Sequence, residues 1–103
     1  MPILSAGELL QAIRDLDPRR PLEIEIGCGN GHFLAQYASA SPQLCVAGLE
    51  LKASRCLKAE KKVSARGLPN AWVALSRAEE LLPQLPAGRI QAYHLYFPDP
   101  WPK

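Results

Sequence analysis

The residues best suited to bind or react with another molecule are the last seven, 97–103, which read FPDPWPK. Prolines on both sides of Asp99 restrict its backbone, so its carboxylate is confined to few positions. Trp101 has a flat ring that can stack on a base or pack beneath the loop, and Lys103 can contact a phosphate. The segment predicts a binding site; a proline-rich turn with Trp101 in the core is the alternative.

A second candidate site is a loop with three alternating glycines, Gly27, Gly29 and Gly31. Because glycine lacks a Cβ atom and tolerates positive φ, the backbone of such a loop can approach a ligand closely. A helix that begins near Asn30 or Gly31 would point free N–H groups at that ligand. The pattern by itself also suits a tight structural turn.

Two carboxylates accompany the glycine loop. Glu50 ends the second predicted strand, roughly twenty residues after the glycines, where an acidic side chain can bind a ribose diol. Strand order reverses beside the first strand, so the loop and Glu50 would share one crevice and bind a cofactor that contains a nucleoside. Glu25 has apolar neighbours, and burying its charge is costly without a partner. We expect it to meet a cationic or donor-rich part of the ligand, or else to be a rim charge on an edge strand.

Alternating strands and helices must position these groups. The sequence predicts strands over 22–26, 45–49, 71–75 and 90–97, with a capped helix from Ser5 that ends before Asp17. Further helices are predicted over 32–40, 52–66 and 78–82. The strands read as near-continuous apolar runs, which is typical of buried parallel strands. The predicted fold class is therefore α/β: a Rossmann-like, parallel, doubly wound sheet that is incomplete, with about four strands and flanking helices.

Composition excludes several other classes. The chain has 103 residues and a net charge of +2, which is too small to indicate nucleic-acid binding by itself. It has no apolar run long enough to cross a bilayer, and we expect a cytoplasmic protein without a membrane partner. Three cysteines without a Cys-x-x-Cys pair predict buried free thiols in a reducing compartment and no metal site: Cys28, Cys45 and Cys56.

Three motifs in one order resemble a known family. The compact glycine spacing directly after Glu25 resembles methyltransferases that use S-adenosylmethionine. Together with residues 48–50 and the ending 97–103, it makes the chain similar, from about Leu22 to Lys103, to the bacterial tRNA (guanine-N7)-methyltransferases. The glycine loop is generic, whereas the ending is much more specific. In that family the ending continues into a basic segment and further strands and helices. We therefore expect residues 1–103 to be the N-terminal part of one cofactor-binding domain, without its C-terminal part and inactive alone.

The resemblance also implies roles for single residues. It implies that S-adenosylmethionine is bound by Glu25, Gly27, Gly29, Gly31, Glu50 and Asp99, with Glu50 at the ribose. Asp99 is also implied as the catalytic residue and Lys103 as a substrate contact, and Trp101 joins Lys103 because it can stack on a base. Arg77 stands at a cofactor-binding position where the family usually has an acidic residue that accepts from the adenine amino group. Arginine has no acceptor, so the backbone or Glu79 would have to bind adenine.

The implied reaction suits these residues. Guanine N7 carries a lone pair and no proton, so its attack on a sulfonium methyl group needs no general base. Catalysis would then depend on alignment and on a carboxylate, Asp99, near the purine as it gains positive charge. The implied partner is tRNA. Two alternatives stay open: a methyltransferase that acts on another planar nitrogen substrate, and a non-catalytic nucleotide-binding module.

Other residues are assigned to the core or the surface. We expect His94 to be a hydrogen-bonded core residue, and Trp72 and Tyr93 to pack on the sheet faces. Four cations at helical spacing form one helix face: Arg55, Lys58, Lys62 and Arg66. A solvated face is favoured for them over a contact with an RNA backbone.

Overall fold

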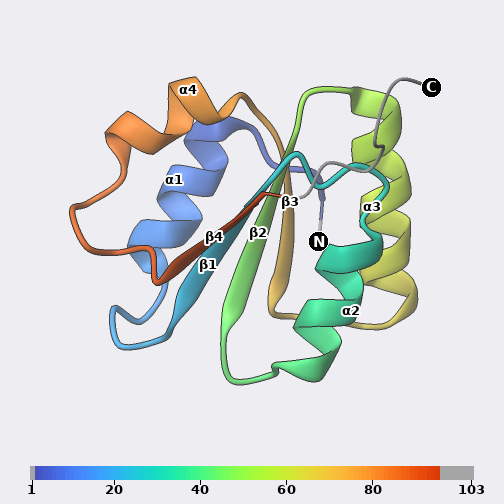
Figure 1. Cartoon of the computed structure of the whole chain (residues 1–103), viewed down its shortest axis with the longest axis horizontal. Coiled ribbons are helices and arrows are strands. Elements are labelled where there is room, and N and C mark those ends of the chain that lie inside the picture. Colours follow the sequence, from blue (N-terminus) through green and yellow to red (C-terminus); the bar gives the residue numbers. More distant parts are fainter. Residues whose placement is uncertain (1, 96–103) are drawn as a thin grey trace.

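The structure is a computed structural model that describes residues 2–95, so the predicted site residues Asp99, Trp101 and Lys103 lie outside the described residues. Within 2–95, four parallel strands form one sheet in the order β3-β2-β1-β4 (Figure 1). The strands are β1 (Leu22–Ile26), β2 (Cys45–Glu50), β3 (Ala71–Leu75) and β4 (Ala92–Leu95). β1 therefore lies between β2 and β4, and strand order reverses beside it, as predicted.

Helices cover both faces of the sheet. The helices α1 (Ala6–Asp15) and α4 (Ala78–Leu81) lie on one side, and α2 (His32–Ala40) and α3 (Ala53–Ala65) on the other (Figure 1). A short 3-10 helix, Leu82–Gln84, continues from α4. The prediction of an α/β fold with a parallel sheet and flanking helices is confirmed.

Sequence signals account for the ends of α1. The Ser5 hydroxyl accepts from the Glu8 backbone N–H at 3.1 Å, and Glu8 Oε1 accepts from the Ser5 N–H at 2.8 Å. This capping box satisfies N–H groups that a helix start leaves without partners. α1 ends before Asp17 and Pro18, because proline disfavours helix at the residue before it. Its buried face, which includes Leu9 and Ile13, packs on the sheet.

The core has two parts, one on each side of the sheet. One part joins α1 and α4 to one face of β1, β2 and β3, and it includes Trp72. The other joins α2 and α3 to the opposite face and includes Cys28 and Cys56. All three cysteines are free and buried, as predicted, and the prediction that Trp72 packs on the sheet is confirmed.

The fourth strand predicted over 90–97 is confirmed over Ala92–Leu95, but its predicted burial is wrong for the described residues. β4 covers only Ala92–Leu95 there, Ile90 lies outside it, and Phe97 lies outside the described residues. Tyr93 is 50% exposed and Leu95 56%, so Tyr93 does not pack on the sheet as predicted. The reason is position: β4 is an edge strand, and the core on the α1 side includes residues of β1, β2 and β3 but none of β4.

Candidate functional site

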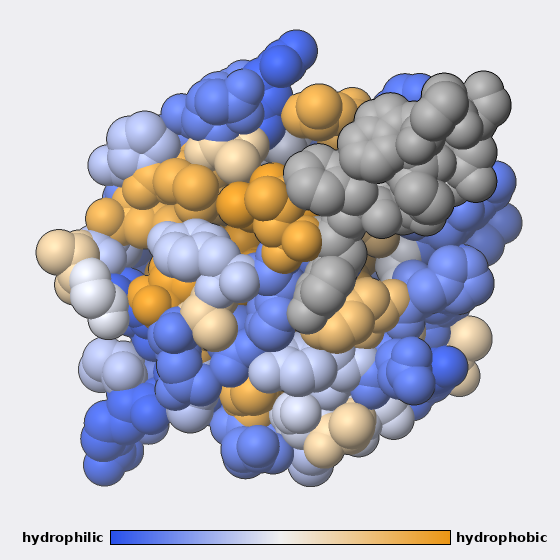
Figure 2. Space-filling view, in the orientation of Figure 1, coloured by the Kyte–Doolittle hydropathy of each residue, from blue (hydrophilic) through white to orange (hydrophobic). Residues whose placement is uncertain are grey.

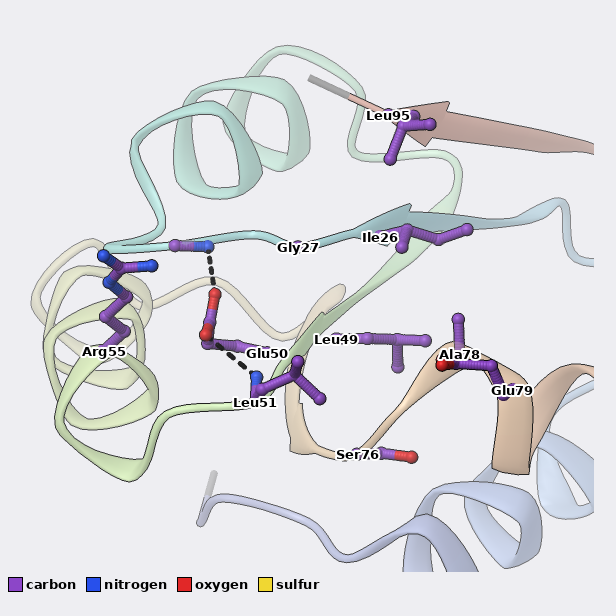
Figure 3. Close-up of a pocket in the computed structure, with 11 residues that line it drawn as sticks. Ile26, Gly27, Leu49, Glu50, Leu51, Arg55, Ser76, Ala78, Glu79 and Leu95 are labelled. Atoms are coloured by element: carbon purple, nitrogen blue, oxygen red, sulfur yellow. Dashed lines mark hydrogen bonds between the residues drawn. The ribbon is translucent and has the colours of Figure 1, made fainter. Parts of the chain in front are cut away.

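A pocket of about 290 Å³ opens where the strands end. Its walls come from the carboxyl ends of β1, β2 and β4, from the glycine loop, and from the chain that follows β2 and β3 (Figure 3). Open parallel sheets bind ligands at this edge, beside the strand where the order reverses. Most of the lining is apolar, from Ile26, Leu49, Leu51 and Leu95. The pocket therefore suits a ligand with a flat apolar part and a few polar groups.

Two of the three loop glycines open toward this pocket. Gly27 has φ 75° and Gly29 φ 58°, a left-handed region that favours glycine, and both line the pocket. A Cβ atom added at either would meet nothing within 4 Å. The backbone there leaves space that a side chain would fill, as close approach to a ligand requires.

Gly31, for which a cofactor contact was predicted, lies outside the pocket wall. It is the N-cap of α2, with φ 85°, and it does not line the pocket. A Cβ atom at Gly31 would lie 2.7 Å from both the Cα and the Cβ of Ala59 in α3. The absent side chain therefore lets α2 and α3 pack closely.

Glu50 is the fixed carboxylate of the site. Its Oε1 accepts from the Gly29 N–H at 3.0 Å, and its Oε2 accepts from the N–H groups of Leu51 and Lys52, each at 2.9 Å (Figure 3). The side chain is only 6% exposed and lines the pocket. Three backbone donors hold it in one orientation, and the start of α3 favours its negative charge. The predicted pairing of Glu50 with the glycine loop is confirmed.

Glu25 is buried but has no hydrogen-bond partner for Oε1 among the described residues. Burial raises its pKa to about 7, from an ordinary value of 4.5. At 3% exposure it is not the rim charge that the sequence left open. It does not line the pocket, but it lies two residues before Gly27, in the strand that leads into the loop. A nearby cation would stabilise its ionised form.

Cys28, inside the loop, is not a nucleophile. Burial, with the charges of Glu25 and Glu50 added, raises the pKa of its thiol. Since the thiolate is the reactive form, Cys28 serves as a small core residue. The Cys28 side chain also accounts for the glycine at position 48, to which the sequence analysis assigned no role. A Cβ atom at Gly48 would lie only 2.8 Å from the Cβ of Cys28.

The segment after β3 divides between two cavities. Ser76, Ala78 and Glu79 line the pocket, whereas Arg77 lines a neighbouring cavity of about 190 Å³ together with Glu80. The predicted cofactor residue Arg77 is therefore beside the pocket and not in its wall, and Glu79 is the acidic group that reaches it.

Arg55 is a pocket residue that the sequence analysis placed only on a helix face. It comes from the first turn of α3 and is drawn beside the glycine loop in Figure 3. Its position five residues after Glu50 is the signal that connects it to the site.

Within residues 2–95, no group of three His, Cys, Asp or Glu side chains is arranged to hold a metal ion. None of the helices in this part of the chain has the length and apolar character to cross a membrane.

The fold matches those of solved methyltransferases. The chain superposes on the bifunctional kinase-methyltransferase WbdD with a TM-score of 0.65 at 19% identity, covering 82% of this chain and 18% of that one. It superposes on coclaurine N-methyltransferase, solved with N-methylheliamine and SAH, with a TM-score of 0.52 at 20% identity, covering 69% of this chain and 20% of that one. The fold is that of the Rossmann-like methyltransferases.

Sequence comparison then gives the family. A family model described as "Putative methyltransferase" matches residues 19–103, and the chain belongs to this methyltransferase family. A tRNA (guanine-N(7)-)-methyltransferase of Anaeromyxobacter dehalogenans is 40% identical over 81 residues, 78% of this chain and 40% of the relative. One of Chromohalobacter salexigens is 37% identical over 102 residues, 97% of this chain and 42% of the relative. The chain thus spans about two fifths of the length of these relatives.

Proposed function

We propose that this chain forms the cofactor-binding part of an enzyme that transfers a methyl group from S-adenosylmethionine to N7 of a guanine in tRNA. Relatives with that named activity, 36–40% identical to the chain, support the substrate. The observation that carries the cofactor is the Glu50 carboxylate, fixed by the Gly29 N–H in a pocket at the carboxyl edge of the sheet. Three free thiols support a reducing, cytoplasmic location.

The described residues fit this cofactor. Glu50 would accept from the ribose hydroxyls, because its carboxylate oxygens have lone pairs beyond those that the backbone uses. Gly27 and Gly29 leave open space for a chain of ligand atoms. Leu51, 59% exposed at the pocket, would cover one face of the base. We assign the acceptor for the adenine amino group to Glu79, since Arg77 lines the neighbouring cavity.

Charge is the second ground for the assignment. The bound cofactor supplies an electrophilic methyl group on a positively charged sulfur and also carries an amino group. Glu25 is buried, has no partner for Oε1 within residues 2–95 and lies next to the glycine loop, so a cationic ligand group would favour its ionised form. We keep Asp99 as the carboxylate near the purine, and Trp101 and Lys103 as substrate contacts.

The first prediction tests the cofactor site. Wild-type chain should bind S-adenosylhomocysteine in a calorimetric titration, and Glu50→Ala should weaken binding at least about tenfold, the effect of losing roughly 1.4 kcal/mol. The physical reason is double: the variant loses the ribose acceptor and releases the Gly29 backbone from Oε1.

The matched control is Glu80→Ala, which removes an exposed carboxylate that does not line the pocket. It should bind with unchanged affinity. Loss of binding in both variants would point to net charge and not to the site. Absence of binding by the wild-type chain would overturn the assignment of the cofactor pocket.

A further inference from the structure

A row of cations along α3 has no role in the methyl transfer proposed for this chain. We name it the basic stripe; it consists of Arg55, Lys58, Lys62 and Arg66. Side chains three or four positions apart on a helix are neighbours, so these four share one flank of α3. The buried face of the helix, with Cys56, Ala59 and Val63, lies against the sheet. The stripe is therefore directed away from the core.

Its charge is concentrated and uncompensated. Residues 52–66 hold six of the chain's twelve lysines and arginines but only one of its ten acidic residues. The rest of the chain has six cations and nine carboxylates, so its net charge is negative, whereas the net charge of residues 52–66 is positive. Within residues 2–95, ion pairs form at Arg19 and at His94, and no ion pair involves the stripe. Like charges at these spacings repel, so a polyanion bound along the flank relieves a cost that folding leaves in place.

The acidic residue of α3 is on the other flank. At 3.6 residues per turn, the position of Glu60 falls on the opposite flank of α3 from the stripe. Its carboxylate accepts a hydrogen bond from the Ser64 hydroxyl. Leu57, 55% exposed, also faces that side. A protein interface has an apolar centre with fewer lysines. The stripe has neither feature, so its composition suits phosphates better than a protein surface.

The stripe begins at the methyl-transfer pocket. Arg55 lines that pocket, and from it the row extends to Arg66 over about 17 Å of helix, eleven residues at about 1.5 Å each. Figure 2 shows hydrophilic surface along the right side of the molecule, where Figure 1 places α3. A polyanion bound along α3 would therefore reach the pocket mouth.

We propose that the basic stripe binds the phosphate backbone of the tRNA substrate and orients it toward the pocket. This inference rests on the proposed function, because it takes its partner from it. Phosphate contacts fix the register and orientation of a nucleic acid without reading its sequence, and double-stranded RNA is recognised largely through its backbone and shape. The small overall charge of the chain makes the stripe an orienting surface more than a source of long-range attraction.

The second prediction tests the stripe by filter binding of an unmodified tRNA transcript to the chain at several salt concentrations. The variant combines Lys58→Gln with Lys62→Gln and leaves Arg55 intact, so that the cofactor pocket is unchanged. Affinity should fall about tenfold at low salt, and the slope of log K against log salt should decrease in size by about two, one for each lost phosphate contact.

A control of equal charge combines Arg14→Gln with Arg19→Gln. Both cations are exposed; Arg14 lies in the last turn of α1, across the sheet from α3, and Arg19 lies in the loop that follows α1. This control should keep the wild-type affinity and salt slope. Circular dichroism and binding of S-adenosylhomocysteine verify that both variants are folded with an intact pocket.

The outcomes separate the stripe from the proposed function. Equal losses in stripe variant and control overturn the stripe and leave tRNA as the partner, since net charge then explains binding. A wild-type chain that binds S-adenosylhomocysteine but no tRNA overturns the stripe while the cofactor site stands. Binding of polyglutamate with the same dependence on Lys58 and Lys62, and tighter than tRNA, assigns the stripe to an acidic protein and overturns the inference.

Discussion

Glu23 and Glu25 lie two residues apart on β1, on the same side of the sheet, and both are 3% exposed. Glu23 has three partners: Oε1 accepts from the Tyr37 hydroxyl at 2.7 Å and contacts His94 Nε2 at 2.7 Å, and Oε2 accepts from Gln91 Nε2 at 2.8 Å. Glu25 Oε1 has none in the described part of the chain. The same residue type on one strand thus has opposite surroundings.

The pKa values of the two groups follow. Burial acts to raise the pKa of Glu23, but hydrogen bonds from His94, Tyr37 and Gln91 outweigh it, and the pKa is lowered. For Glu25 burial acts alone and raises the pKa to about 7. Glu23 serves the fold, because its partners tie α2 and β4 to β1. Glu25, next to the glycine loop, is a cost to the fold that a cationic ligand can offset.

The third prediction concerns the removal of Glu23, whose two carboxylate oxygens both have hydrogen-bond partners. Glu23→Ala should lower the free energy of unfolding by about 2 kcal/mol, because it leaves the donors of Tyr37, Gln91 and His94 without their part-buried acceptor. Urea denaturation at pH 7 measures it. Since the pKa of Glu23 is lowered by folding, its contribution is complete above its ordinary value of 4.5 and is lost as pH falls through the folded value. The difference from wild type should therefore shrink in acid. A loss below 0.5 kcal/mol, typical of exposed sites, would contradict the role of the network.

The fourth prediction is a gain in stability, whereas the third is a loss. Glu25→Gln should stabilise the chain by about 2 kcal/mol at pH 8, after allowance for solvent screening. A raised pKa means that the folded state disfavours the charged form, so wild type loses stability as pH rises from 4.5 through about 7. Glutamine does not titrate, and the two proteins should converge below pH 4.5.

Calorimetry with S-adenosylhomocysteine completes this test, because the stabilised Glu25→Gln should bind the cofactor product more weakly than wild type. A variant that is less stable than wild type at pH 8 would mean that the buried carboxylate has an acceptor role in the fold, like Glu23.

Much of the scaffold could be predicted from the sequence. Pro21 before β1 and the glycines after it bracket a strand whose bounds, Leu22–Ile26, were predicted correctly, and α2 and β3 were equally clear. The pairing of Glu50 with the loop could be predicted because parallel strands end at one edge. The prediction that His94 is hydrogen-bonded is confirmed by its contact with Glu23, but the residue is half-buried and belongs to neither part of the core.

The predictions that failed concern contacts between parts of the chain that are far apart in sequence. Glycine spacing does not distinguish Gly29, which opens to the pocket, from Gly31, which packs on Ala59 of α3. An apolar run does not reveal that the α1 layer stops short of β4, which leaves Tyr93 and Leu95 half exposed. The partners of Glu23, from α2 and the β4 region, were also not predicted, since only the folded sheet brings them together.

The fifth prediction separates one hydrogen bond from the network. Tyr37→Phe keeps the ring, which stacks on Phe33 with centroids 5.1 Å apart and meets His94 edge-on at 4.9 Å, but removes the hydroxyl donor to Glu23. Stability should fall by about 1 kcal/mol, the usual net value of one hydrogen bond. In a Glu23→Ala background the same change should cost much less, because the acceptor is gone. An equal cost in both backgrounds would show that the hydroxyl acts elsewhere. Glu25 should then be the only one of the two carboxylates whose removal strengthens the fold, because no donor in the described chain depends on it.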